Sequence, residues 1–168
     1  WVKEYGILNG TALTDTITTD CFLKDFQLTY ATLFSGVRHD SGDPFEWGEK
    51  MIKHYKNLGI NPQNKTLLFS DSLDFERADK LYKYFSKKIN VAFGIGTYIS
   101  NDTDVPALNI VMKTTKCNGM DVAKISDTPG KGMCRNPKYE HYLTRCIDWR
   151  IKMLEVGTKA PDFELPDQ

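Results

Sequence analysis

Residues 36–44, with the sequence GVRHDSGDP, bring together the side chains best suited to chemistry. The segment is predicted to end a short strand, to turn, and to begin a helix for which Asp43 is a good N-cap. Because side chains alternate along a strand, Arg38 and Asp40 are expected to share one face, with the Ser41 hydroxyl beside them. A guanidinium, two carboxylates and a hydroxyl then converge where a helix N-terminus offers free N–H groups. The alternative for this turn is a purely structural salt bridge.

Three further predicted strands end in polar or glycine-rich clusters. A first run ends at Asp15 and Thr16, the apolar run 66–70 is followed by Asp71, and strand 91–93 is followed by the glycine-rich residues 94–97. In parallel α/β folds, ligands bind at the carboxyl ends of the strands. Four such clusters on one sheet edge favour a ligand site over the purely structural interpretation.

The clusters suit a phosphorylated sugar. Gly94, Gly96 and Thr97 offer backbone N–H groups and a hydroxyl for a phosphate monoester, although a plain glycine turn is the alternative. Asp40 and Asp71 could accept hydrogen bonds from vicinal hydroxyls such as those of ribose. No Ser–His–Asp or Cys–His spacing indicates nucleophilic catalysis, and no metal-cage motif is present in the sequence. The residues therefore favour binding a phosphosugar over covalent chemistry on an acyl group.

The elements that must position these groups alternate as strand, helix, strand, helix, strand. Helices are predicted at about 18–26, 44–58 and 74–87, which indicates βα units and an α/β fold with a parallel sheet or barrel. After Ser100 the helical period is lost. Asn118-Gly119 predicts a β-hairpin whose returning strand is 122–126. Three lysines lie near this hairpin in the sequence: Lys113, Lys124 and Lys131. A solvent-exposed face explains them as well as contacts to a ligand do.

Composition excludes several classes of protein. The 168 residues are 40% hydrophobic, enough for one core, and Lys+Arg and Asp+Glu are both 22. No net charge therefore favours nucleic acid or an anionic membrane, and no apolar run approaches the roughly 20 residues of a membrane span. No targeting segment is recognised. The scattered cysteines indicate free thiols in a reducing cytoplasm: Cys21, Cys117, Cys134 and Cys146.

Six segments carry a family resemblance: 11–16 (TALTDT), 36–44 (GVRHDSGDP), 69–74 (FSDSLD), 93–97 (FGIGT), 108–113 (LNIVMK) and 122–131 (VAKISDTPGK). In this order they resemble the motifs of nicotinate phosphoribosyltransferases of the bacterial type. The resemblance extends over residues 1–149. It implies a partial, roughly half, irregular α/β barrel of the type II phosphoribosyltransferase kind, followed by a β-hairpin region.

The resemblance also implies an activity. The family makes nicotinate mononucleotide and pyrophosphate from nicotinate and 5-phosphoribosyl 1-pyrophosphate in NAD biosynthesis, with Mg²⁺ and with ATP hydrolysis through a transient phosphohistidine. By position, Arg38 resembles the base-binding arginine, and Asp40 and Asp71 resemble the ribose and metal-side carboxylates. Residues resembling the 5′-phosphate cradle are Ser70, Gly96 and Thr97. The family works as a dimer or as a monomer with a similar site, so a homodimer is one expectation.

The residue types and the family resemblance together define the expected site. Arg38, Asp40 and Asp71 are predicted to be catalytic, and no residue is assigned as a metal ligand. The substrate-binding set is predicted to contain these three and Ser41, Ser70, Gly94, Gly96 and Thr97.

Two departures from the family are evident. The family's phosphorylated histidine lies upstream of residue 1, and none of His39, His54 and His141 matches it, so we expect a fragment that is inactive alone. Residues 153–168 resemble the opening of a peroxiredoxin but stop before its peroxidatic cysteine. Residues 150–168 are therefore expected to be a fused or disordered tail. The rival interpretations are an inactive phosphosugar-binding fragment and, more remotely, a redox protein.

Overall fold

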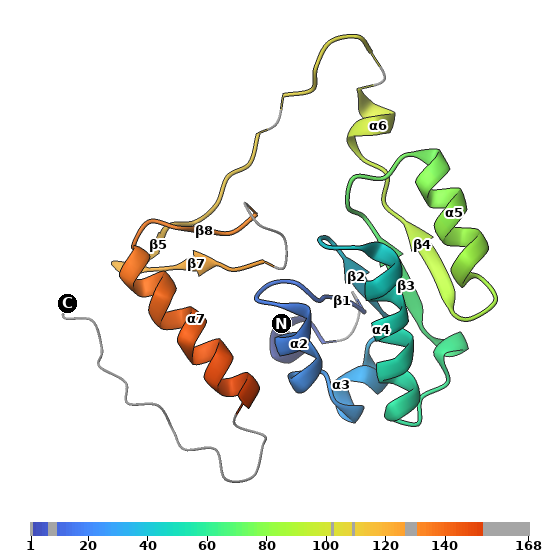
Figure 1. Cartoon of the computed structure of the whole chain (residues 1–168), viewed down its shortest axis with the longest axis horizontal. Coiled ribbons are helices and arrows are strands. Elements are labelled where there is room, and N and C mark those ends of the chain that lie inside the picture. Colours follow the sequence, from blue (N-terminus) through green and yellow to red (C-terminus); the bar gives the residue numbers. More distant parts are fainter. Residues whose placement is uncertain (1, 7–9, 102, 109, 127–130, 153–168) are drawn as a thin grey trace.

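A four-stranded parallel sheet forms the centre of the chain (Figure 1). The computed structural model describes residues 2–6, 10–101, 103–108, 110–126 and 131–152. The strands are β1 (Thr11–Leu13), β2 (Gly36–His39), β3 (Thr66–Phe69) and β4 (Asn90–Phe93), in the spatial order β1-β2-β3-β4. Each strand thus pairs with its neighbour in sequence. The predicted mixed α/β class with a parallel sheet is confirmed.

The segments between the strands contain α2 (Thr19–Asp25) and α3 (Leu28–Leu33) before β2, α4 (Pro44–Asn57) and a 3₁₀ turn η1 (Pro62–Asn64) before β3, and α5 (Phe75–Phe85) before β4. Helix α1 (Val2–Tyr5) precedes the sheet, and α6 (Thr97–Ser100) and α7 (Pro137–Lys152) follow it. Buried side chains of α3, α4 and α5 form one core cluster with the sheet. Within the described residues, no helix combines the length and the apolar character that crossing a membrane needs.

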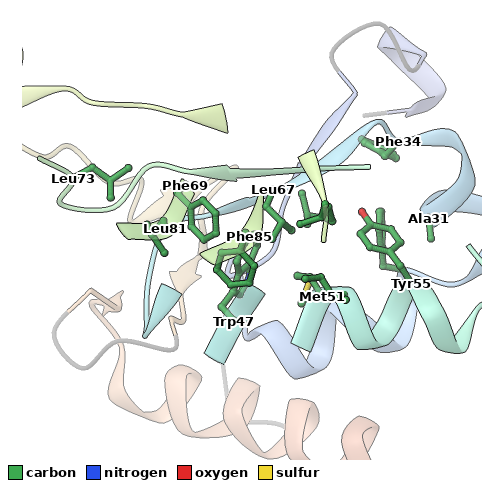
Figure 2. Close-up of a cluster of buried hydrophobic side chains, with 14 residues drawn as sticks. Ala31, Phe34, Trp47, Met51, Tyr55, Leu67, Phe69, Leu73, Leu81 and Phe85 are labelled. Atoms are coloured by element: carbon green, nitrogen blue, oxygen red, sulfur yellow. The ribbon is translucent and has the colours of Figure 1, made fainter. Parts of the chain in front are cut away.

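The core lies between α4, α5 and the sheet (Figure 2). Met51 of α4 and Phe85 of α5 contribute to one cluster with Leu67 and Phe69 of β3, and each of these is 0 or 1% exposed. Leu68, on the opposite face of β3, is only half-buried, although a continuous apolar run is typical of a strand covered on both faces. The second face of the sheet is therefore less completely covered than the first.

Side-chain caps begin α2, α4 and α5, the three helices that the sequence pattern predicts. Thr18 accepts a hydrogen bond from the Cys21 N–H (3.1 Å), and Asp74 accepts one from the Arg77 N–H (2.7 Å). Asp43 caps α4 by the same kind of contact. Helix α3, which has no side-chain cap, was not expected from the sequence. The expectation that no helix follows Ser100 is wrong, because α7 forms there and Asn136 Oδ1 accepts from the N–H groups of Lys138 and Tyr139 at its start.

The hairpin forms with a different returning strand from the one expected. Asn118 and Gly119 have φ of 50° and 81°, as a two-residue type I′ turn requires. The strands around them are β5 (Lys116–Cys117) and β6 (Met120–Asp121). The segment expected to return instead forms β7 (Ala123–Lys124), which pairs with β8 (Met133–Cys134). A two-residue turn brings the chain back immediately, so pairing is completed before residue 122.

Helix α7 continues to Lys152 and so crosses the expected boundary at residue 150. The peroxiredoxin-like segment 153–168 lies outside the described residues.

Candidate active site

The carboxyl ends of β2 and β3 meet because His39 pairs with Phe69 in the parallel register. Arg38 Nε donates to Ser70 Oγ (2.8 Å), and Arg38 Nη2 donates to Asp40 Oδ1 (3.2 Å). Ser70 Oγ in turn donates to the carbonyl oxygen of His39 (2.9 Å). The Arg38 side chain remains 43% exposed, so the guanidinium is oriented by its neighbours and still open to a ligand.

The salt bridge in the turn forms between Arg38 and Asp40, but Asp43 takes no part in it. Arg38 and Asp40 share one face of the strand, as alternation predicts. Asp43 is engaged elsewhere, because its Oδ1 accepts hydrogen bonds from the N–H groups of Phe45 and Glu46, both at 2.9 Å. Arg38 is thus positioned by Asp40 and Ser70.

Lys131, which is distant in the sequence, also contacts residues at this edge of the sheet. Its Nζ donates to Asp71 Oδ1 (2.7 Å) and to the carbonyl oxygen of Asp40 (2.8 Å). Sequence reasoning left this lysine undecided because its partners lie 60 and 91 residues away. The family motif at 122–131 was the only signal that could have placed it here. Asp71 also accepts from Ser72 Oγ (3.2 Å), and Ser72 has a positive φ of 49°.

The predicted phosphate cradle lines an open pocket of about 670 Å³. Gly94 packs closely, since a Cβ built there would lie 3.2 Å from Ser70 Cβ. A Cβ on Gly96 would meet no atom within 4 Å, so this glycine leaves open space in front of the backbone. The predicted residues that the structure brings together in this pocket are Ser70, Gly94, Gly96 and Thr97.

Ser41 lies apart from that pocket. It is 3% exposed, and its Oγ donates to Asp15 Oδ2 at 2.5 Å. It borders a separate pocket of about 180 Å³ beside α4. Of the predicted substrate-binding residues, Ser41 is therefore the one turned into the protein.

His39 is buried behind the site at 2% exposure. Its Nε2 lies 3.2 Å from the carbonyl oxygen of Gly42, and its ring centroid lies 5.1 Å from that of Trp47. Burial lowers the pKa of His39, and the carboxylates of Asp71, Asp15 and Asp40 oppose that shift. The imidazole is therefore a neutral packing group near pH 7.

The described residues contain no group of three or more His, Cys, Asp or Glu side chains able to cage a metal. Mg²⁺ commonly needs only one or two carboxylates because substrate phosphates and waters complete its shell. Asp40 and Asp71, linked through Lys131 at one edge, fit that requirement.

Fold and site together define an α/β protein with a polar side-chain cluster at the carboxyl edge of a parallel sheet, where α/β proteins bind their ligands, beside an open pocket. Residues 1–149 match the nicotinate phosphoribosyltransferase (NAPRTase) family, and the chain belongs to that family.

Known relatives agree with this membership. The chain is 59% identical over 144 residues to nicotinate phosphoribosyltransferase 2 of Pseudomonas aeruginosa, covering 85% of this chain and 36% of the relative. It is 52% identical over 149 residues to the enzyme of Shigella boydii, covering 88% of this chain and 37% of the relative. The chain thus spans less than two-fifths of the length of these relatives.

Solved structures show the same fold. The Vibrio cholerae nicotinate phosphoribosyltransferase is 43% identical with a TM-score of 0.83, over 92% of this chain and 40% of that chain. A putative nicotinate phosphoribosyltransferase from Saccharomyces cerevisiae is 34% identical with a TM-score of 0.80, over 88% of this chain and 38% of that chain.

Proposed function

We propose that this chain supplies part of the active site of a nicotinate phosphoribosyltransferase. The whole enzyme would convert nicotinate and 5-phosphoribosyl 1-pyrophosphate to nicotinate mononucleotide and pyrophosphate, assisted by ATP. The observation that carries the proposal is the half-exposed Arg38 guanidinium, oriented by Asp40 and Ser70 at the edge that also holds the 670 Å³ pocket. Family membership supports the choice of substrates.

The sheet is proposed to be roughly half of an irregular α/β barrel. Strands that follow one another in space in their sequence order are typical of barrel sheets. The half-buried face of β3, represented by Leu68, would then face the barrel interior. The cytoplasm and a homodimer are the proposed location and assembly, as the family resemblance implies, and the balanced charge favours small-molecule substrates over nucleic acid or membrane.

The reaction exchanges one bond at the ribose C1 carbon. The ring nitrogen of nicotinate forms a bond to C1, and the bond from C1 to the pyrophosphate oxygen breaks with its electron pair leaving on pyrophosphate. Arg38 is proposed to bind the nicotinate carboxylate through two parallel N–H···O bonds, which a guanidinium provides and an ammonium does not. Catalysis then consists of positioning and electrostatic stabilisation.

The remaining residues are proposed to hold the sugar and its phosphates. Ser70, Gly96 and Thr97, with Gly94, would receive the 5′-phosphate in their pocket. Asp71 would accept from a ribose hydroxyl. Mg²⁺ would be held by Asp40 and Asp71 and would neutralise charge on the pyrophosphate.

Two substitutions in the full-length enzyme that carries these residues test the proposal. Arg38→Lys should lower kcat/KM for nicotinate about ten- to a hundredfold, the equivalent of roughly 1.5–3 kcal/mol for a charged hydrogen bond. Thr97→Val should instead raise KM for 5-phosphoribosyl 1-pyrophosphate, because it removes a donor from the phosphate pocket. Lys83→Met, which breaks an exposed ion pair with Asp79, is the control and should change neither.

Two outcomes would contradict the proposal. Near-normal kinetics with a lowered Tm in Arg38→Lys would make Arg38 a structural residue. If the full-length enzyme binds phosphosugar without forming nicotinate mononucleotide, the inactive binding protein is the better interpretation.

A further inference from the structure

Asp15, just beyond the end of β1, is a buried carboxylate that the proposed chemistry does not use. It is 1% exposed. Its Oδ2 accepts from the buried Ser41 hydroxyl, whereas its Oδ1 is buried without a hydrogen-bond partner in the part of the chain that the structure describes. An unsatisfied buried polar atom carries an uncompensated desolvation penalty. A carboxylate retained under that penalty calls for a functional explanation.

The partner of Asp15 sits in the turn that carries the site. Ser41 lies between Asp40 and Gly42, and Gly42 has a positive φ of 84°. Asp40 orients Arg38 through its carboxylate and meets Lys131 through its carbonyl oxygen. Any displacement of Ser41 is therefore passed directly to the residue that aligns the guanidinium.

Thr14, between the end of β1 and Asp15, anchors the other side of the same segment. Thr14 Oγ1 donates to the carbonyl oxygen of Arg38 (3.3 Å) and accepts from Trp47 Nε1 (2.9 Å). Residues 14 and 15 thus tie down the backbone of Arg38 and the turn at Ser41 at two points. Two such hydrogen-bonded anchor points are the arrangement expected of a support that fixes a binding geometry.

We propose that Asp15 is a positioning residue, which through Ser41 holds the 40–42 turn so that Asp40 presents Arg38 in the orientation that binds the nicotinate carboxylate. This inference rests on the proposed function. It also reassigns Ser41, whose hydroxyl acts on Asp15 and does not touch substrate.

The test is a set of substitutions in the full-length enzyme, with kinetics and Tm measured on each. Ser41→Ala should lower kcat/KM for nicotinate about tenfold while KM for 5-phosphoribosyl 1-pyrophosphate changes less than about twofold. Ser41→Thr, which keeps the hydroxyl, should restore most of the activity. Asp15→Asn keeps an acceptor for Ser41 and should cost less than about threefold, whereas Asp15→Ala should match Ser41→Ala.

Coupling between the two residues gives the decisive measurement. The double variant Asp15→Ala/Ser41→Ala should be no slower than the slower single variant, because the two residues act as one unit. Additive losses would show that Ser41 contacts substrate on its own and would overturn the proposal. A fall in Tm with unchanged kcat/KM would overturn it too, since the pair would then be purely structural.

Milder variants and the parent enzyme separate the remaining outcomes. If the alanine variants do not fold, Asp15→Asn still tests the proposal, because a large loss of kcat/KM in this variant would show a direct role for the charge and would overturn positioning through Ser41. A parent enzyme that makes no nicotinate mononucleotide would instead refute the proposed function.

Discussion

His39 shows at the scale of one residue how burial separates packing groups from reacting groups. It is adjacent in sequence to Arg38 and Asp40, yet it points to the opposite face and contacts Trp47. Its pKa is lowered by burial, so the folded protein takes up a proton at lower pH than the unfolded chain does. Between pH 6.5, the pKa of this histidine in the unfolded chain, and its lower pKa in the folded protein, only the unfolded chain binds the proton. The free energy of unfolding therefore falls as the pH is lowered through this range.

We therefore expect the free energy of unfolding of the full-length enzyme to decrease from pH 7 towards pH 5. The contribution of His39 has a limiting slope of about 1.4 kcal/mol per pH unit. His39→Gln removes this contribution and should flatten the pH dependence, as measured by urea denaturation at several pH values. An unchanged slope in the variant would show that other groups cause the loss.

The sequence could predict the parts of the site that depend on local geometry. Arg38 and Asp40 are two residues apart on a strand, so their meeting follows from alternation. The partners of Asp15 and Lys131 could not be found in this way, because Ser41 lies 26 residues from Asp15 and Asp40 lies 91 from Lys131. Such contacts depend on strand order and on the path of later loops.

At the scale of elements, the close approach of α4 and α5 depends on Gly48. A Cβ on Gly48 would lie within 3 Å of the Phe85 ring, as near as 2.4 Å to Cζ. Phe85 is fully buried and stacks on Phe69 with centroids 5.6 Å apart, so it has little room to move. Gly48 therefore sets the distance between the helices that cover the sheet.

Gly48→Ala should destabilise the enzyme by about 1–2 kcal/mol, because overpacking outweighs the better helix propensity of alanine. Urea midpoints of the parent and the variant measure this. The matched test repeats the change in a Phe85→Leu background, where the smaller side chain should reduce the cost. An equal cost in both backgrounds would exclude the clash as its cause.

End signals made α4 and α5 predictable, whereas α7 was missed although Asn136 caps it and Pro137 begins it. Asp43 and Asp74 cap α4 and α5 where the sequence indicates helix starts. Helix α3 follows Gln27, which makes no capping hydrogen bond, and so gave no start signal. The apolar pattern predicts that the returning strand of the hairpin is 122–126. The two-residue turn instead requires pairing to begin at Met120, and the structure follows the turn.

At the scale of the whole molecule, one extended segment is strongly apolar and exposed. Leu108, Ile110 and Met112 are 86, 75 and 93% exposed. Contiguous exposed apolar side chains mark surfaces that another part of a protein covers or that aggregate. The relatives are more than twice as long as this chain, which agrees with a missing cover.

The 168-residue chain expressed alone should therefore self-associate and show no turnover, as light scattering, gel filtration and an assay for nicotinate mononucleotide would show. Ile110→Lys combined with Met112→Lys should reduce the self-association. Tyr82→Lys, at a 55% exposed aromatic residue of α5, is the control and should not. A monodisperse, cooperatively melting and active monomer would contradict the expectation.

The order of strands also bears on how the chain is made. Because β1, β2, β3 and β4 pair strictly with their neighbours in sequence, each new strand docks on one that the ribosome has already released. Among these four strands, no later strand inserts between two earlier ones, so this part of the sheet grows at a single edge in the direction of translation. This stretch of the enzyme is thus suited to folding one βα unit at a time during its synthesis.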